Sequence, residues 1–187
     1  MWVLFMFFSS IRERRLWGWT TAVLIAIFSS LGLAQTAAGF LRAQGLITAA
    51  FWLGLILIGT AVLALGIKAR PGGVEIGIGL SIIAVYLIAL LRMTIPEERS
   101  HLIEYSVLAL LIHEALIERS QNGRFVPSPP LLAILITSLL GTLDELIQLL
   151  LPNRIFDPRD ILFNILAAIM AISGRTLLTW ARKRWPR

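Results

Sequence analysis

The chain is a succession of six long apolar stretches separated by short polar turns. No charged residue occurs in 16–41 or in 43–67, and further stretches cover about 74–91, 97–117, 129–151 and 158–180. A bilayer core of about 30 Å needs roughly 20 helical residues, so each stretch is long enough to cross it. None alternates polar and apolar residues as a barrel strand does. The pattern therefore predicts an all-α, polytopic transmembrane bundle of about six spans.

Composition supports this class and excludes others. Apolar residues make up 57% of the 187 residues, charged residues make up 15%, and mean hydropathy is +0.81. Soluble domains carry about 25% charged residues, and disordered chains are much less hydrophobic. The chain has no cysteine, which excludes disulfides and thiol catalysis. We also expect no cofactor, because neither a phosphate-binding loop nor a standard nucleophile motif occurs.

The turns contain residues that begin and end helices. Pro96 is suited to a first helical turn, and Asp157 followed by Pro158 resembles an N-cap with proline at the first helical position. Gly73-x-x-x-Gly77 would permit close helix packing. We divide the chain into an N-terminal three-span region (1–95) with an apolar and basic leader, a three-helix region (96–175) and a basic tail (176–187). The leader is too short to span, and its arginines follow the apolar residues, unlike those of a signal peptide.

Basic residues indicate the orientation. The N-terminus, the turns 68–75 and 118–127, and the C-terminal end would share one side and hold 12 of the 17 basic residues. Because lysine and arginine collect in cytoplasmic loops, both termini are predicted to be cytoplasmic. The net charge of +6 has the same explanation. We expect membrane lipids as partners and no nucleic acid, since no basic stripe with interleaved aromatic residues is present.

Polar residues that are energetically unfavourable inside a membrane gather in the second half of the chain. On each of the last three predicted helices they recur at a spacing of three or four, which places them on one face at the outer end. Ionisable groups inside a membrane mark a functional site or a buried pair. The candidate site comprises His101, Glu104, Tyr105, Asp144, Glu145, Gln148, Arg154, Asp160 and Asn164. We predict that it forms a polar pocket in the outer half of the bundle.

Two blocks of these residues resemble the VanZ-like family of bacterial membrane proteins. The first is Glu98-Arg99-Ser-His101-Leu-Ile-Glu104-Tyr105, and the second runs from Asp144-Glu145 through Gln148 and Pro152-Asn-Arg154 to Asp160 and Asn164. The resemblance covers about 96–171. It departs where Ala167 replaces a usual glycine. It implies a multi-pass protein of the bacterial cytoplasmic membrane, in a family named for a protein linked to resistance against teicoplanin, a lipid-bearing glycopeptide.

Several residues allow a structural interpretation as well as a functional one. Glu145 and Gln148 could contact a ligand, or could bond to Arg154 and hold the bundle together. Asp160 could complete a capping box or pair with an arginine in the site. His101 and Glu104 form His-x-x-Glu, which lacks the further ligands of a metal site, so no metal is predicted. His113 and Glu114 are expected to be interfacial and structural.

Three classes of function remain open. The first is recognition of an amphiphile of the cell envelope, such as a lipid-linked wall precursor or a lipoglycopeptide, with an effect on antibiotic susceptibility. The second is an interfacial hydrolase or transferase acting on a lipid head group, in which Glu104 and Asp144 or Glu145 would be acid and base. The third is a small accessory subunit of a larger membrane complex. The absence of an evident nucleophile disfavours the enzyme without excluding it.

Overall fold

A computed structural model describes residues 8–93, 96–151 and 156–185 and contains only helices and turns in those ranges. The helices are α2 (Ile11–Ala43), α3 (Ile47–Ala69), α4 (Gly73–Arg92), α5 (Pro96–Gln121), α6 (Pro129–Leu149) and α7 (Pro158–Arg184). Each overlaps one predicted apolar stretch and ends within about five residues of it. The all-α prediction is confirmed. The first residues of the leader, 1–7, lie outside the described ranges.

Four of these helices are long and apolar enough to cross a membrane. They are α4, α5 from Arg99 to Gln121, α6 and α7. The chain is thus a membrane protein with several apolar helices. The helices α2 and α3 lie where the first two spans are predicted, while the total of six spans and the side of the termini stay predictions.

The predicted helix starts follow from local chemistry. The Asp157 carboxylate accepts a hydrogen bond from the Arg159 N–H at 2.9 Å, and Pro158 opens α7, as expected of an N-cap. Helices α5 and α6 also begin at prolines, whose missing N–H is harmless in a first turn. At the start of α2 the Ser10 hydroxyl caps the helix by accepting from the Glu13 N–H at 2.9 Å.

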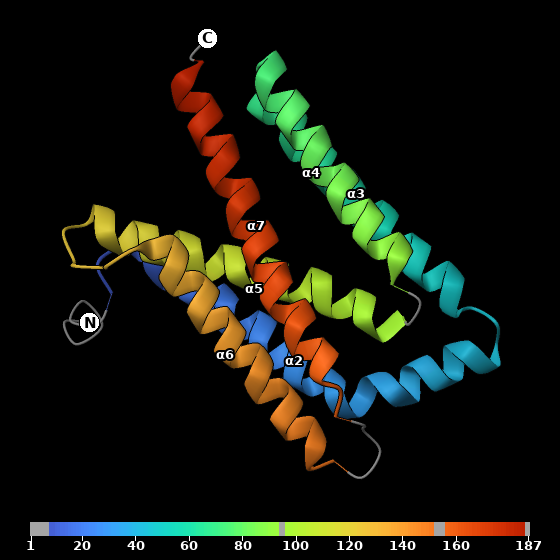
Figure 1. Ribbon diagram of the computed structural model, residues 1–187. Helices are drawn as coiled ribbons and strands as arrows, with labels where there is room; N and C mark the ends of the chain where they lie inside the picture. Colours follow the sequence, from blue (N-terminus) through green and yellow to red (C-terminus); the bar gives the residue numbers. More distant parts are fainter. Residues whose placement is uncertain (1–7, 94–95, 152–155, 186–187) are drawn as a thin grey trace.

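Helix α5 is the core of the molecule. Its residues Tyr105, Leu108, Ala109 and Ile112 have no exposed surface, because α2, α6 and α7 pack around it. Figure 1 shows α5 crossing behind α7, with α2 and α6 beside it. Helix α4 also contacts α7, but most of its large side chains are exposed, as suits a helix facing lipid.

Among the described residues, two glycines allow close helix contacts, and neither belongs to the predicted Gly73-x-x-x-Gly77 motif. No described atom lies within 4 Å of where a Cβ would stand at Gly73 or Gly77, so that motif makes no close packing among the described residues. Gly141 on α6 instead meets Asn164 of α7, and Gly174 on α7 meets Ile82 of α4. The close approaches therefore fall on α7, the helix shared by both interfaces.

Candidate functional site

Seven of the nine predicted site residues come together at one end of the bundle, where α5 begins, α6 ends and α7 begins. The antiparallel course of these helices brings faces that are far apart in sequence to the same level. We call this group the polar cluster. It consists of His101, Tyr105, Asp144, Glu145, Gln148, Asp160 and Asn164.

The His101 ring lies between two carboxylates from different helices. Its Nδ1 is 4.0 Å from Asp144 Oδ2, and its Nε2 is 3.8 Å from Asp160 Oδ2. Both distances exceed that of a hydrogen bond. The Tyr105 ring, one helical turn away, stacks on the imidazole with centroids 5.9 Å apart and planes inclined by 16°. The histidine therefore has fixed neighbours on three sides.

Gln148 links the two acidic residues of α6. Its Nε2 donates to Glu145 Oε1 at 2.8 Å and more weakly to Asp144 Oδ2 at 3.4 Å. The second oxygen of Glu145 accepts from the Asp157 N–H at 3.4 Å. In a capping box that N–H would bond to Asp160, whose Oδ2 lies 3.8 Å from His101 Nε2. Neither interpretation of Asp160 named this histidine, and both interpretations stay predictions.

Asn164 joins α7 to α6 below the charged groups. Its Nδ2 donates to the Gly141 carbonyl at 3.4 Å, and its side chain fills the space that a Cβ at position 141 would occupy. The asparagine has no exposed surface. Gly141 is thus required for Asn164 to approach the α6 backbone.

The polar cluster is buried. Asp144, Glu145 and Asn164 are 0% exposed, and the Asp160 side chain, at 15%, is among the more accessible parts. The pocket that we predicted at these residues stays a prediction. Glu104 is half-buried beside Tyr105 and we leave it outside the cluster, while Arg154 lies outside the described residues.

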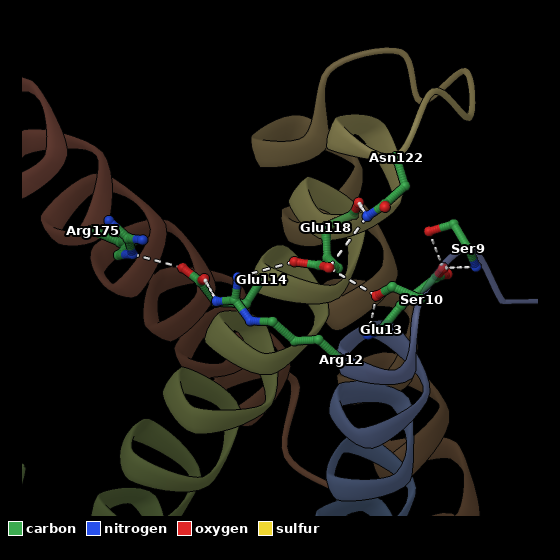
Figure 2. A network of polar contacts seen from close by, with 8 residues as sticks. All are labelled: Ser9, Ser10, Arg12, Glu13, Glu114, Glu118, Asn122 and Arg175. Atoms are coloured by element: carbon green, nitrogen blue, oxygen red, sulfur yellow. Dashed lines mark hydrogen bonds and ion pairs between the residues drawn. The ribbon is translucent and has the colours of Figure 1, made fainter.

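A second polar group, which sequence reasoning missed, lies where α2 begins and α5 ends (Figure 2). We call it the ion-pair network. Its charged members are Arg12, Glu13, Glu114, Glu118, Arg119 and Arg175. Sequence patterns indicated only the side of the membrane for these residues, since partners 61 to 106 positions apart carry no local signal. Glu114 contacts α2 and α7, which fits its predicted structural role. His113 is buried at 3% exposure, and its position at the membrane interface stays a prediction.

Short contacts hold the ion-pair network together. Glu118 accepts from Arg12 Nη1 at 2.9 Å and from the Ser10 hydroxyl at 2.8 Å, which fastens α2 to α5. Glu114 accepts from Arg175 Nε at 2.7 Å, which fastens α5 to α7. These charge-assisted bonds join three helices at the end opposite the polar cluster.

Glu13 is the most deeply buried carboxylate among the described members of this network. It accepts from the Ser9 N–H and hydroxyl at 2.5 and 2.6 Å and from Arg119 Nη1 at 2.9 Å. Burial alone raises its pKa, but the bonds from Ser9 and Arg119 favour the charged form more strongly. The pKa of Glu13, which precedes the apolar run of α2, therefore lies below its ordinary value of 4.5.

Comparison with protein families gives a match over nearly the whole chain. The family model described as VanZ/LLP1 matches residues 1–179. The chain belongs to the VanZ/LLP1 family. The match includes α2, α3 and α4, which carry none of the VanZ-like polar blocks. No match was found among curated proteins or among solved structures.

The VanZ-like blocks account for the polar cluster. All seven of its members belong to the two blocks, from His101 to Asn164. Ala167, which stands where the family usually has glycine, is fully buried, and its carbonyl accepts from the Ser106 hydroxyl at 3.3 Å. The substitution is accommodated within the α5–α7 contact.

Proposed function

We propose that this VanZ-family protein binds an amphiphile of the bacterial envelope from within the cytoplasmic membrane and thereby modulates susceptibility to lipid-bearing glycopeptides. The observation that supports the proposal is a groove of about 230 Å³ between α4, α5 and α7, near the polar cluster. Six apolar side chains and one arginine line it: Ala89, Arg92, Met93, Leu102, Phe163, Leu166 and Met170.

The groove suits part of an acyl chain. Pockets that enclose a whole drug-sized ligand measure roughly 300–1,000 Å³, so this one would hold a segment of chain and leave the head group outside. Arg92 is exposed at the last turn of α4, where a membrane helix meets the head groups. Its guanidinium would bind a phosphate or carboxylate. Arg99 donates to the Met93 carbonyl at 3.0 and 2.8 Å and so fixes the end of the groove.

Orientation completes the proposal. We place both termini in the cytoplasm on the basis of the basic residues, which puts the groove and the polar cluster in the outer half of the bilayer. Arg182 pairs with Glu75 at 2.9 Å, so the end of α7 meets the start of α4, and we assign both ends to the cytoplasmic side. A ligand of the outer leaflet would reach the groove laterally.

The test is retention of lipid by purified protein. Ala89→Phe fills the groove, whereas Ala84→Phe adds the same ring to an exposed position of the same helix. In native mass spectrometry from phosphatidylglycerol nanodiscs, we expect Ala89→Phe to lose bound lipid and Ala84→Phe to keep it. Arg92→Gln should reduce the preference for phosphatidylglycerol over phosphatidylcholine. Equal retention by the two alanine variants would refute the groove.

The cellular consequence is tested with the same variants. Expression of wild-type protein in a susceptible host should change the teicoplanin concentration that stops growth. Ala89→Phe should abolish the change and Ala84→Phe should preserve it at equal expression. An identical response from both variants would show that the effect on susceptibility does not depend on lipid binding in the groove.

A further inference from the structure

We infer that the polar cluster is a binding site for one divalent transition-metal ion, held by His101, Asp144 and Glu145. One donor atom from each of these residues lies within 4.8 Å of the other two. All three residues are buried, and they come from two helices that are packed together. The inference concerns the core of the bundle and stands independently of the groove.

The donor spacing suits a metal after a small movement. Nitrogen and oxygen ligands lie about 2.0–2.2 Å from zinc in a tetrahedral arrangement, so two ligands of one ion are about 3.3–3.6 Å apart. His101 Nδ1 and Asp144 Oδ2, at 4.0 Å, would have to approach by about 0.5 Å. The remaining donors, which lie within 4.8 Å of one another, would have to approach by up to about 1.4 Å through side-chain rotation.

The surroundings match the usual second shell of a metal site. A metal-bound histidine commonly donates its other ring N–H to a carboxylate. Asp160 Oδ2 stands 3.8 Å from Nε2, on the opposite side of the His101 ring from Asp144. Gln148 holds Glu145 Oε1 at 2.8 Å and so fixes the third ligand. Asp160 and Gln148 would therefore orient the two ligands His101 and Glu145.

Tyr105 closes one side of the proposed site. The side chain is 0% exposed, and its ring stacks on the His101 imidazole. Three protein ligands would leave a further position on the ion for a water molecule. Zinc sites that bind water use three protein ligands in the same way.

The donor set selects the class of ion. One imidazole nitrogen with carboxylate oxygens suits Zn²⁺, Mn²⁺ or Fe²⁺, whereas Mg²⁺ and Ca²⁺ prefer oxygen alone. Several carboxylates at membrane depth also require a balancing positive charge. That charge is a metal ion, a proton or the guanidinium of Arg154, and the experiment separates the three.

The experiment measures zinc in the full-length protein, purified with a tag that contains no histidine. After equilibration with Zn²⁺ and removal of free ion, we expect one zinc per chain and a higher unfolding temperature. His101→Gln should remove the zinc, and Asp160→Asn should weaken binding by roughly 10–100-fold. His113→Gln, which alters a buried histidine elsewhere on α5, should retain it.

Two further measurements keep the test decisive if a variant folds poorly. Co²⁺ bound to wild-type protein should give visible absorption bands, and Zn²⁺ should displace them. Arg154→Gln should leave zinc binding intact. Wild-type protein that folds but holds no zinc would overturn the inference and favour the proton. The additional loss of folding in Arg154→Gln would instead assign the balancing charge to the arginine.

Discussion

Gly141→Ala tests how tightly α6 and α7 are packed. A Cβ at this position would lie 2.7 Å from Asn164 Cβ, where ordinary contact begins near 3.4 Å. Asn164 Cβ is attached directly to the α7 backbone, so rotation of the side chain cannot move it away. The two helices would have to separate by about 0.7 Å at their contact. Overpacking of this kind costs about 1–3 kcal/mol of unfolding free energy.

Two other glycines provide matched controls. A Cβ at Gly174 would lie 3.1 Å from Ile82 Cδ1, the flexible end of a side chain, so we expect Gly174→Ala to cost less than about 1 kcal/mol. Gly77 has open space, and Gly77→Ala should be neutral or stabilising by up to about 1 kcal/mol, since alanine favours helix. From most to least stable, the expected order is Gly77→Ala, then Gly174→Ala, then Gly141→Ala.

The assay is unfolding in mixed micelles with increasing SDS, followed by tryptophan fluorescence. A second substitution identifies the clash itself. Asn164→Gly removes the struck Cβ and should recover part of the loss in Gly141→Ala, whereas Asn164→Ala keeps that atom and should recover less. The coupling energy with Gly141→Ala, measured in double-mutant cycles, should thus be larger for Asn164→Gly than for Asn164→Ala. Equal stability of the Gly141→Ala and Gly77→Ala proteins would refute the reasoning.

The ion-pair network and the orientation give three further predictions. The pKa of Glu13 is lowered on folding, so the ionised side chain contributes fully to the free energy of unfolding above pH 4.5 and loses this contribution as the pH falls through the folded pKa. Glu13→Gln protein should therefore lose less unfolding free energy on acidification than wild type. Glu114→Gln should destabilise by about 1 kcal/mol or less in the same assay, since its partners are partly exposed, and a loss of several kcal/mol would contradict this. In the cysteine-free background, a membrane-impermeant thiol reagent should label Arg159→Cys but not Ser120→Cys in intact cells, and the reverse pattern would invert the orientation.

Sequence patterns were sufficient for the helices and for most of the polar cluster. Apolar run length and proline position fix where a membrane helix starts, because both depend on local chemistry. The cluster was predictable because its members recur at helical spacing on three adjacent segments. The position of His101 beside Asp160 was not predictable, since spacing along one helix does not show which side chain of another helix lies opposite.

Other features depend on contacts between helices, which residue spacing along the chain does not reveal. The Gly73-x-x-x-Gly77 motif has open space, whereas Gly141 and Gly174 are close contacts without any paired-glycine spacing. The bond between Arg12 and Glu118 likewise joins residues 106 positions apart. Burial of the polar cluster was missed because helical spacing shows which residues share a face, and does not show how closely that face is covered.

The central position of α5 has a consequence for how the protein is made. This helix carries His101 and Glu114 among its inward residues, and their charged neighbours lie on α2, α6 and α7 rather than on the preceding helix, α4. A segment with such groups is expensive to release alone into lipid. During synthesis α5 leaves the ribosome before α6 and α7, which will cover it. Its stable insertion therefore has to await their arrival, so truncation after residue 128 should leave a product that fails to integrate.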